Sequence, residues 1–276
     1  MTRARWFSIL LCAAGVAAVA APAAAQYTML RAPNPATGEK YHFEVSGVFW
    51  QPDPSIVISS ESIGIPGTDI DFVRDLGILD ANFTELRTVL RFARKHKLRF
   101  DYLPMKYEAD TVLTRTIIFN GIAYTVGIPV EADLEWRTYR FGYEWDMFYR
   151  DRWFVGLLLE AKYTDVRAEL TAPVIGTEFA EARGPIPSIG VVGRGYVTSN
   201  ISVTGQFSFF NLPNDIFKIE DYDGDVYDFD ICGTVNFTNN VGAQVGYRYI
   251  DVGYTAELDT GDLKVKGFYF GGVVRF

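Results

Sequence analysis

The sequence predicts an all-β fold, a transmembrane antiparallel up-and-down β-barrel of ten strands, with eight strands as the alternative count. The first observation is the regular alternation over residues 227–249, where apolar side chains such as Phe229 and Ile231 trade places with polar ones such as Asp230. A period of two residues is that of a strand. The alternation lasts about eleven residues on each side of the turn at 238–240, whereas strands of globular proteins average about five or six residues and tilted strands that cross a bilayer need about nine to eleven. The strand length therefore favours a barrel that spans a membrane.

The second observation is an N-terminus that predicts export. A basic start precedes an apolar run over residues 6–21, and small residues lead up to Ala25, which is the organisation of a secretory signal peptide cleaved after that alanine. We expect residues 1–25 to be a signal peptide and residues 26–276 to form the barrel. A membrane anchor is the first alternative, but the run is rich in alanine and ends in a cleavage site. A lipoprotein signal acylated at Cys12 is the second, but leucines precede this cysteine where such signals carry a small residue.

The third observation is the end of the chain. Phe268, Phe270 and Val274 share one face of an alternating segment that ends at Phe276. This segment resembles the terminal strand of bacterial outer-membrane β-barrel proteins, which the barrel-assembly machinery recognises. The resemblance implies a protein of the Gram-negative outer membrane, with the assembly machinery as a partner.

A second resemblance lies near the first long connection. Residues 67–77, followed by residues 86–98, are similar to a stretch in uncharacterised proteobacterial outer-membrane barrel proteins. It covers about a quarter of the chain after the signal peptide. This resemblance implies a membrane barrel and no active site.

Ten segments carry the strand alternation. They are residues 41–50, 86–92, 98–102, 139–149, 153–164, 188–197, 201–209, 227–237, 241–249 and 263–276. Aromatic residues gather where these segments meet turns, as at Tyr149, Trp153 and Tyr247, which is typical of the interfacial girdle of a membrane barrel. A soluble β-sandwich is the alternative, but it gives little reason for aromatic-rich apolar faces on every strand.

The connections differ in length and predict the orientation of the barrel. We expect long loops near 52–82, 110–130, 168–185 and 213–225, and short turns elsewhere. Outer-membrane barrels have short periplasmic turns and longer outer loops, so both termini are expected in the periplasm. Within the second long loop, Asn120-Gly121 predicts a tight β-hairpin.

Charged residues on the inward-facing positions predict a polar lumen. The expected lumen-lining residues are Glu44, Arg87, Arg91, Arg99, Asp101, Arg140, Glu144, Asp146, Glu160, Lys162, Arg194, Asp228, Asp230 and Arg248. Open aqueous channels belong to barrels of about sixteen strands or more, so ten strands leave little free bore and acids and bases are expected to pair across it. The alternative is a selective pore. In that case Arg87, Arg91 and Arg99, if not neutralised, would form a basic stripe that attracts anions.

Composition and motifs exclude several functions. Cleavage of the signal peptide would remove two cations and lower the net charge from −8 to −10, so the chain is a poor candidate for binding nucleic acid. The cleaved chain would keep only Cys232, so no internal disulfide is expected. Outer-membrane enzymes such as the ten-stranded proteases and the lipid A hydrolases rely on a histidine near the outer end. His42 and His96 are expected at the periplasmic end instead, so we predict neither enzyme activity nor a cofactor.

A dense acidic cluster raises the question of a metal site. Asp221, Asp223 and Asp225 are its members, but the glycine spacing and the missing glutamate do not fit a calcium loop of the EF-hand type. We predict no metal, with a loose divalent-ion site that bridges to lipopolysaccharide phosphates as the alternative.

The function expected from these patterns is non-enzymatic: an outer-membrane barrel with a largely plugged, charged lumen and a structural or surface-interaction role. A narrow channel for small solutes or anions is the second hypothesis, and an enzyme or adhesin acting through the outer loops is the third. We expect the barrel to be a monomer whose partners are outer-membrane lipid and lipopolysaccharide. The sequence identifies no substrate or ligand.

Overall fold

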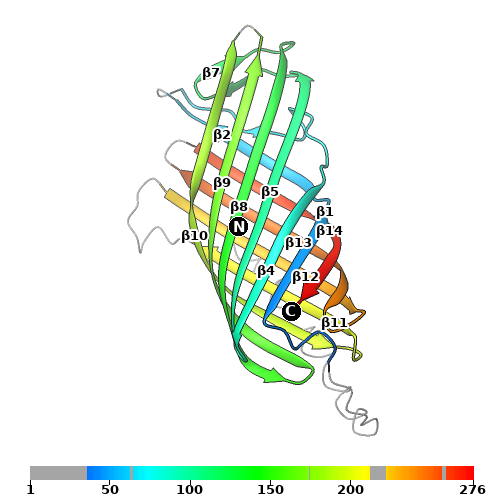
Figure 1. The fold of residues 1–276 in the computed structure, drawn as a ribbon. Coiled ribbons are helices and arrows are strands. Elements are labelled where there is room, and N and C mark those ends of the chain that lie inside the picture. The colour runs from blue at the N-terminus through cyan, green and yellow to red at the C-terminus, as the bar shows by residue number, and fades with distance from the viewer. Residues whose placement is uncertain (1–35, 63–64, 174, 212–221, 257–258) are drawn as a thin grey trace, which may run out of the picture. The chain divides into compact units, whose positions relative to one another are not determined.

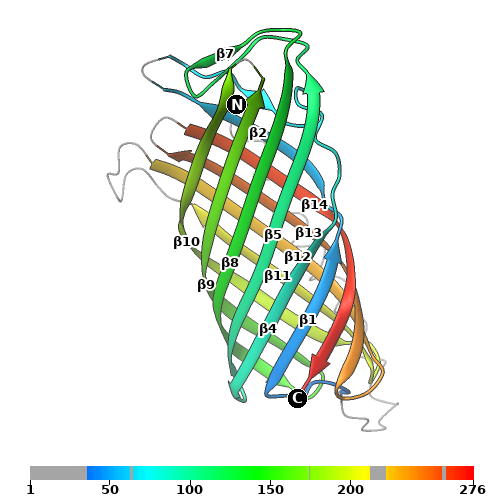
Figure 2. The same ribbon diagram turned by 45° about the horizontal axis from the view of Figure 1, so that its top comes forward.

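The computed structural model describes residues 36–62, 65–173, 175–211, 222–256 and 259–276. Within them, ten antiparallel strands follow one another around a barrel in the order β1-β4-β5-β8-β9-β10-β11-β12-β13-β14, and β14 pairs back with β1 (Figures 1 and 2). The barrel strands are β1 (Phe43–Trp50), β4 (Phe83–Ala93), β5 (His96–Val112), β8 (Pro129–Arg150), β9 (Trp153–Ala172), β10 (Gly176–Tyr196), β11 (Ile201–Asn211), β12 (Tyr222–Asn236), β13 (Val241–Ala256) and β14 (Asp259–Arg275). The predicted fold class and the strand count of ten are confirmed.

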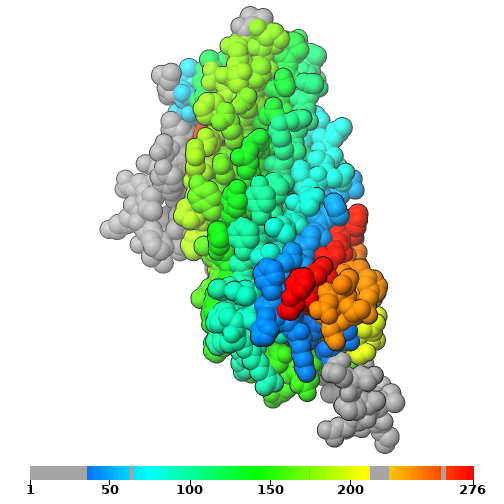
Figure 3. Space-filling view, in the orientation of Figure 1, coloured from blue at the N-terminus to red at the C-terminus, as the bar shows by residue number. Residues whose placement is uncertain are grey.

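The first and last strands close the barrel. β1 and β14 lie against each other, and their colours, blue and red, meet on the face shown in Figure 3. The register pairs Glu44 with Arg275 and Trp50 with Tyr269. No strand of the barrel is therefore left with an open edge at this position, which is the condition for crossing a bilayer with strands. The part of the chain that the structure describes contains no helix of the length and apolarity needed to cross a membrane.

The two ends of the barrel differ. Four short turns, at 94–95, 151–152, 197–200 and 237–240, lie at the end that also holds Phe276, and we call this part of the barrel the turn half. The opposite part, the loop half, holds three features that lie outside the barrel order: β2 (Asp53–Ser60), β3 (Ile70–Asp71) and the hairpin of β6 (Ile117–Phe119) and β7 (Ile122–Tyr124). The start of the described chain is in the turn half, because the amide of Thr37 donates to the carbonyl of Ser199.

The polarity of both barrel faces inverts between the two halves. In β8, Arg140 and Glu144 point inward in the turn half, and Leu134 and Trp136 occupy the same inward face in the loop half; all four are buried. The outward face changes in the opposite sense, from Phe141, which is 56% exposed, to charged residues in the loop half. These outward charges include Lys106, Glu108, Glu135, Arg137, Arg167, Glu169, Asp251 and Lys264.

The level of this inversion marks the edge of a membrane. Tyr102 and Tyr139 stack with ring centroids 4.8 Å apart, and Tyr163 is the register partner of Tyr139 on the next strand. Amphipathic rings prefer the interface between hydrocarbon and water. The turn half is therefore the membrane-spanning part, where lipid contacts the outside, and the loop half is built like a water-soluble barrel with an apolar core.

Two segments that were predicted as loops contain strands in the loop half. Residues 168–185, expected as a loop, are strand on both sides of a short connection, because β9 continues to Ala172 and β10 begins at Gly176. Residues 52–82 begin with β2, which extends the pairing of β1 along β14 after an interruption at Gln51 and Pro52. The physical reason is the inverted polarity. The prediction looked for strands with an apolar outward face, so strands whose outward face is charged were assigned to loops.

The other two expected loops have different outcomes. In 110–130, β5 ends at Val112 and β8 begins at Pro129, and the hairpin predicted at Asn120-Gly121 is present. Both turn residues have positive φ angles, 49° and 77°, as a tight hairpin turn of the primed type requires. In 213–225, residues 213–221 lie outside the described residues, and β12 begins at Tyr222.

Candidate functional site in the barrel lumen

The residues expected to line the lumen are all in the interior of the turn half. Twelve of them are buried, and Arg87 and Arg99 retain side-chain exposures of 16% and 14%. The buried members are Glu44, Arg91, Asp101, Arg140, Glu144, Asp146, Glu160, Lys162, Arg194, Asp228, Asp230 and Arg248. Alternation brings them together because every second residue of a strand points inward.

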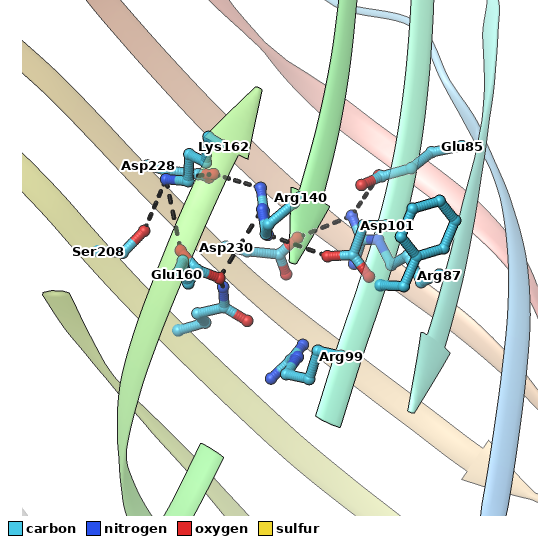
Figure 4. A network of polar contacts seen from close by, with 12 residues as sticks. Glu85, Arg87, Arg99, Asp101, Arg140, Glu160, Lys162, Ser208, Asp228 and Asp230 are labelled. Carbon is cyan, nitrogen blue, oxygen red and sulfur yellow. Dashed lines mark hydrogen bonds and ion pairs between the residues drawn. The ribbon is translucent and has the colours of Figure 1, made fainter. Parts of the chain in front are cut away.

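Arg140 lies at the centre of the network (Figure 4). Its guanidinium contacts Asp228, Asp101 at 3.2 Å and Glu160 at 3.8 Å, so one cation from β8 joins carboxylates from three other strands. Lys162 from β9 is the second cation here, with its Nζ 3.3 Å from Asp228 and 2.8 Å from the hydroxyl of Ser208. These ion pairs and hydrogen bonds connect strands that are far apart in the sequence.

A second group lies between β4, β12 and β13. Arg248 contacts Asp228 at 3.0 Å and Glu85 at 2.5 Å. Arg87 contacts Glu85 at 2.7 Å and Asp230 at 2.9 Å, and it donates to the hydroxyl of Tyr269. Glu85 therefore pairs with both Arg87 and Arg248, two residues that the sequence predicted in the lumen.

A third group lies closer to the turns. The ammonium of Lys97 is 2.5 Å from Glu144 and 3.0 Å from Asp146, and Arg99 is 3.0 Å from the other oxygen of Glu144. Lys97 also lies over the ring of Phe154, with its Nζ 3.6 Å from the centroid. All of these cations have a carboxylate partner.

The turn end is closed by the segment that precedes β1. Glu39 lies 2.8 Å from Arg91 and 3.5 Å from Arg194, and it accepts a hydrogen bond from the hydroxyl of Tyr196. The neighbouring Gly38 has a φ of +80°, and a Cβ there would be 2.7 Å from a nitrogen of Arg275. The positive φ favours glycine at this position, and a Cβ there would also displace the Arg275 guanidinium.

Sequence reasoning missed three members of this network. Glu39 precedes the first expected strand, Lys97 was placed in a turn, and Glu85 stands just before an expected strand start. The spacing of Glu85 and Lys97 provided a usable signal, because each is two residues from an expected lumen residue, Arg87 and Arg99 respectively. Glu39 had no such signal, since its position depends on how the segment folds under the barrel.

The basic stripe considered for Arg87, Arg91 and Arg99 does not exist as a free cationic surface. Each of these arginines has a carboxylate within 3.0 Å. The condition for attracting anions, that the three are not neutralised, is therefore not met.

The two histidines lie in the turn half. Nδ1 of His42 is 3.3 Å from the carbonyl of Arg91, and Nδ1 of His96 is 2.6 Å from the hydroxyl of Tyr143. His96 begins β5 instead of standing within the turn.

The acidic cluster is only partly described. Asp221 lies outside the described residues, and Asp223 and Asp225 are part of β12. Among the described residues, no group of three or more His, Cys, Asp or Glu side chains is placed to hold a metal ion.

Comparisons with known proteins place the fold. No family profile matches the chain, and no curated protein sequence matches it. The outer membrane protease OmpT from Escherichia coli is similar in structure, with a TM-score of 0.55 at 8% identity over 85% of this chain and 96% of that one. Ail of Yersinia pestis, solved with the heparin analogue sucrose octasulfate, has a TM-score of 0.37 at 11% identity over 85% of this chain and 99% of its own. OprG from Pseudomonas aeruginosa has a TM-score of 0.37 at 11% identity over 86% and 98%. At these identities the similarity to OmpT concerns the fold alone.

Proposed function

We propose that this chain is a closed, non-enzymatic barrel that presents its rigid loop half at the cell surface. Its fold is of the bacterial outer-membrane barrel type. Its role is structural or surface-interacting. The observation that carries this proposal is the inversion of polarity between the two halves, because it closes the lumen twice.

The first closure is the ion-pair network of the turn half. Arg140, Arg248 and Lys162 join carboxylates across the bore at the level of Asp228. An ion that enters this layer has to displace paired charges. Such networks specify one packing of the interior more than they add stability.

The second closure is the apolar core of the loop half. Trp136, Tyr107 and Ile58 each have an exposed fraction of 1% and belong to one continuous cluster of buried side chains. Moving an unpaired charge into such surroundings costs tens of kcal/mol in the idealised limit. A small ion therefore has no path here while the core stays packed.

The cap of the loop half is held by polar ties. Arg115, which precedes the β6–β7 hairpin, lies 2.6 Å from Asp75 in the connection between β3 and β4. At the tip, the amide of Asn120 donates to Glu178 in β10 at 2.9 Å. These ties support a fixed surface at the loop end, and a fixed surface suits recognition by a partner because little ordering is needed on binding.

The outer membrane is the location that we propose, with the turn half toward the periplasm. Short turns at one end and extended strands at the other support this orientation, as does the expected signal peptide over residues 1–25. We further propose a monomer surrounded by outer-membrane lipid and lipopolysaccharide, inserted by the barrel-assembly machinery through the strand that ends at Phe276.

Planar-bilayer recording tests the closed state. The wild-type barrel is expected to give no steady single-channel steps. A variant that opens only the network, Arg140→Gly with Arg248→Gly, is expected to stay silent because the apolar core still closes the bore. Steady steps from the wild type would refute the proposal and favour the narrow channel.

Labelling of introduced cysteines tests the orientation. In a Cys232→Ser background, Glu131→Cys in the loop half is expected to react with a membrane-impermeant maleimide on intact cells. Asp151→Cys, in a short turn, is expected to react only after lysis. The opposite pattern would reverse the orientation. Screening the purified barrel for protease and lipid hydrolase activity addresses the enzyme hypothesis, and activity above that of a denatured control would contradict a non-enzymatic role.

A further inference from the structure

Two neighbouring turns of the turn half carry exposed cations. Arg94 and Lys95 form the connection between β4 and β5, and Arg150 and Arg152 flank the tip of the connection between β8 and β9. All four side chains are exposed, and none has a carboxylate within salt-bridge distance among the described residues. Two of them contact backbone carbonyls: Lys95 donates to the carbonyl of Met147, and Arg150 to that of Tyr149.

The two turns form one surface, which we call the basic turn patch. The carbonyl of Lys95 accepts a hydrogen bond from the amide of Asp146 at 2.8 Å, which ties the first turn to β8. The guanidinium of Arg94 lies over the ring of Tyr149, 5.1 Å from its centroid. Asp151 is the acidic residue within these turns, so the patch keeps an excess of positive charge.

Several outward cations of the loop half are paired with carboxylates instead. Lys106 lies 3.1 Å from Asp133, Arg167 lies 2.9 Å from Glu169, and Lys264 lies 2.8 Å from Asp262. Each of these three cations therefore has its charge balanced by a neighbouring carboxylate. Among the described residues, Lys40 and Lys266 are the other exposed cations without a salt bridge, so the basic turn patch is distinguished by the grouping of four such cations on two neighbouring turns.

Among the four short turns, only these two neighbouring ones carry charged residues. The two remaining short turns have the sequences Val-Thr-Ser-Asn at 197–200 and Phe-Thr-Asn-Asn at 237–240, with no charged residue in either. A requirement for general solubility or for a uniform membrane surface would distribute charge around the rim. The exposed cations of the short turns are therefore concentrated beside β4, β5, β8 and β9.

The patch lies at the depth of lipid headgroups. Phe92, Phe148 and Trp153, with exposed fractions of 56%, 60% and 45%, point outward within two residues of the cations. Strands rise about 3.3 Å per residue and tilt by about 40° in such barrels, so two residues correspond to about 5 Å along the membrane normal. The guanidinium groups can therefore reach the phosphate layer just beyond the hydrocarbon that these rings contact.

We propose that the basic turn patch binds the phosphate groups of anionic phospholipids in the adjacent leaflet. Arginine recognises phosphate through paired N–H donors, and lysine contributes a point charge. The partner class follows from depth: a phosphodiester at the membrane surface is within reach of all four cations, whereas an acidic protein would have to bury itself among headgroups. This inference rests on the proposed membrane location and does not depend on which end faces the periplasm.

Fluorescence quenching by brominated lipids tests the proposal. Trp145 and Trp153 are outward and partly exposed near the patch, while Trp50 and Trp136 are buried in the barrel interior. The barrel of residues 26–276 is reconstituted in vesicles that contain phosphatidylcholine and phosphatidylglycerol, with bromine on one of the two lipids. We expect about fivefold enrichment of phosphatidylglycerol near the two tryptophans, since one cation near an anionic surface contributes ~1 kcal/mol. The enrichment should fall as salt is raised.

The matched variants separate the patch from general charge effects. Arg94→Gln, Lys95→Gln, Arg150→Gln and Arg152→Gln together are expected to abolish the enrichment. The same number of substitutions in the loop half, at Lys106, Arg137, Arg167 and Arg183, is expected to leave it unchanged.

If the fourfold patch variant does not fold, as judged by the gel-mobility shift on heating, the pair Arg150→Gln and Arg152→Gln replaces it and is expected to reduce the enrichment. Equal quenching by the two lipids in the wild type, enrichment that survives in the patch variant, or capture of an acidic protein without lipid preference would each overturn the proposal. Because the vesicles are symmetric, these results are independent of the orientation tested by cysteine labelling.

Discussion

Removing Arg140 is the perturbation that most directly tests the lumen network. Arg140→Met takes a cation away from Asp228, Glu160 and Asp101. Two of these carboxylates keep a partner: Asp228 retains Arg248 at 3.0 Å, and Glu160 retains Lys162 at 3.5 Å.

Asp101 has no second ion-pair partner in the part of the chain that the structure describes. Arg140 is its ion-pair partner among the described residues, and its Oδ1 already lacks a hydrogen bond there. Its exposed fraction is 3%, so water does not replace the lost contact. Breaking a buried pair from one side costs about 3–5 kcal/mol, and we expect Arg140→Met to lower the free energy of unfolding by that amount.

The companion variant shows whether the cost arises from the stranded carboxylate. Arg140→Met combined with Asp101→Leu removes both charges, and apolar replacement of a whole buried pair is often neutral. We expect the double variant to be more stable than Arg140→Met by about 2 kcal/mol, a coupling within the range for residues in contact. Lys264→Met, which breaks an exposed pair with Asp262, is the control and should cost at most about 1 kcal/mol.

Equilibrium unfolding by urea in lipid vesicles, followed by tryptophan fluorescence, measures these differences. A loss for Arg140→Met no larger than that for Lys264→Met would refute the network as a set of desolvated pairs. A double variant less stable than Arg140→Met would show that Asp101 is not the origin of the cost.

Three further predictions concern other parts of the barrel. Leu159→Arg, on the outward face of the turn half, should cost about 2–4 kcal/mol in vesicle unfolding, whereas Tyr163→Arg at the girdle should cost about 0–1, because an arginine facing lipid is costliest at the midplane; equal costs would contradict the assigned membrane level. Glu39→Gln leaves a buried guanidinium without its carboxylate and should cost about 3 kcal/mol, with faster hydrogen exchange over 36–42; unchanged exchange there would show that this segment does not depend on the pair. The hydrogen bond from Arg115 holds the pKa of Asp75 below its usual value of 3.8, so its stabilisation is present above pH 3.8 and is lost as the pH falls further. Pepsin cleavage of the loop should therefore increase only below that pH in the wild type and be faster at all pH values in Asp75→Asn; an increase already at pH 5 would contradict this assignment.

Local chemistry explains why much of the fold could be predicted. Alternation over 227–249 and the Asn120-Gly121 turn depend on a few consecutive residues, and both are present in the structure. Inward charges such as Arg140 and Asp228 were also predictable, because the side-chain period of a strand is two wherever the strand lies.

The loop half was predictable only in part, because the meaning of a charge depends on its level. In β9, Arg167 and Glu169 face outward, whereas Lys162 and Glu160 on the same strand face inward. Water surrounds the barrel at the first pair and lipid at the second. A pattern search that assumes lipid outside throughout assigns 168–185 to a loop.

The pairings of the network required the closed barrel. Glu39 and Arg194 are separated by 155 residues, and Arg248 and Glu85 by 163. The order of residues along the chain establishes that a polar face and an apolar face exist on each strand, since this follows from backbone geometry. Only the closed barrel of ten strands, surrounded by lipid at one level and by water at another, establishes which acid pairs with which base. The same holds for the level at which the interior changes from charged to apolar. Both depend on distances between residues that lie far apart in the sequence.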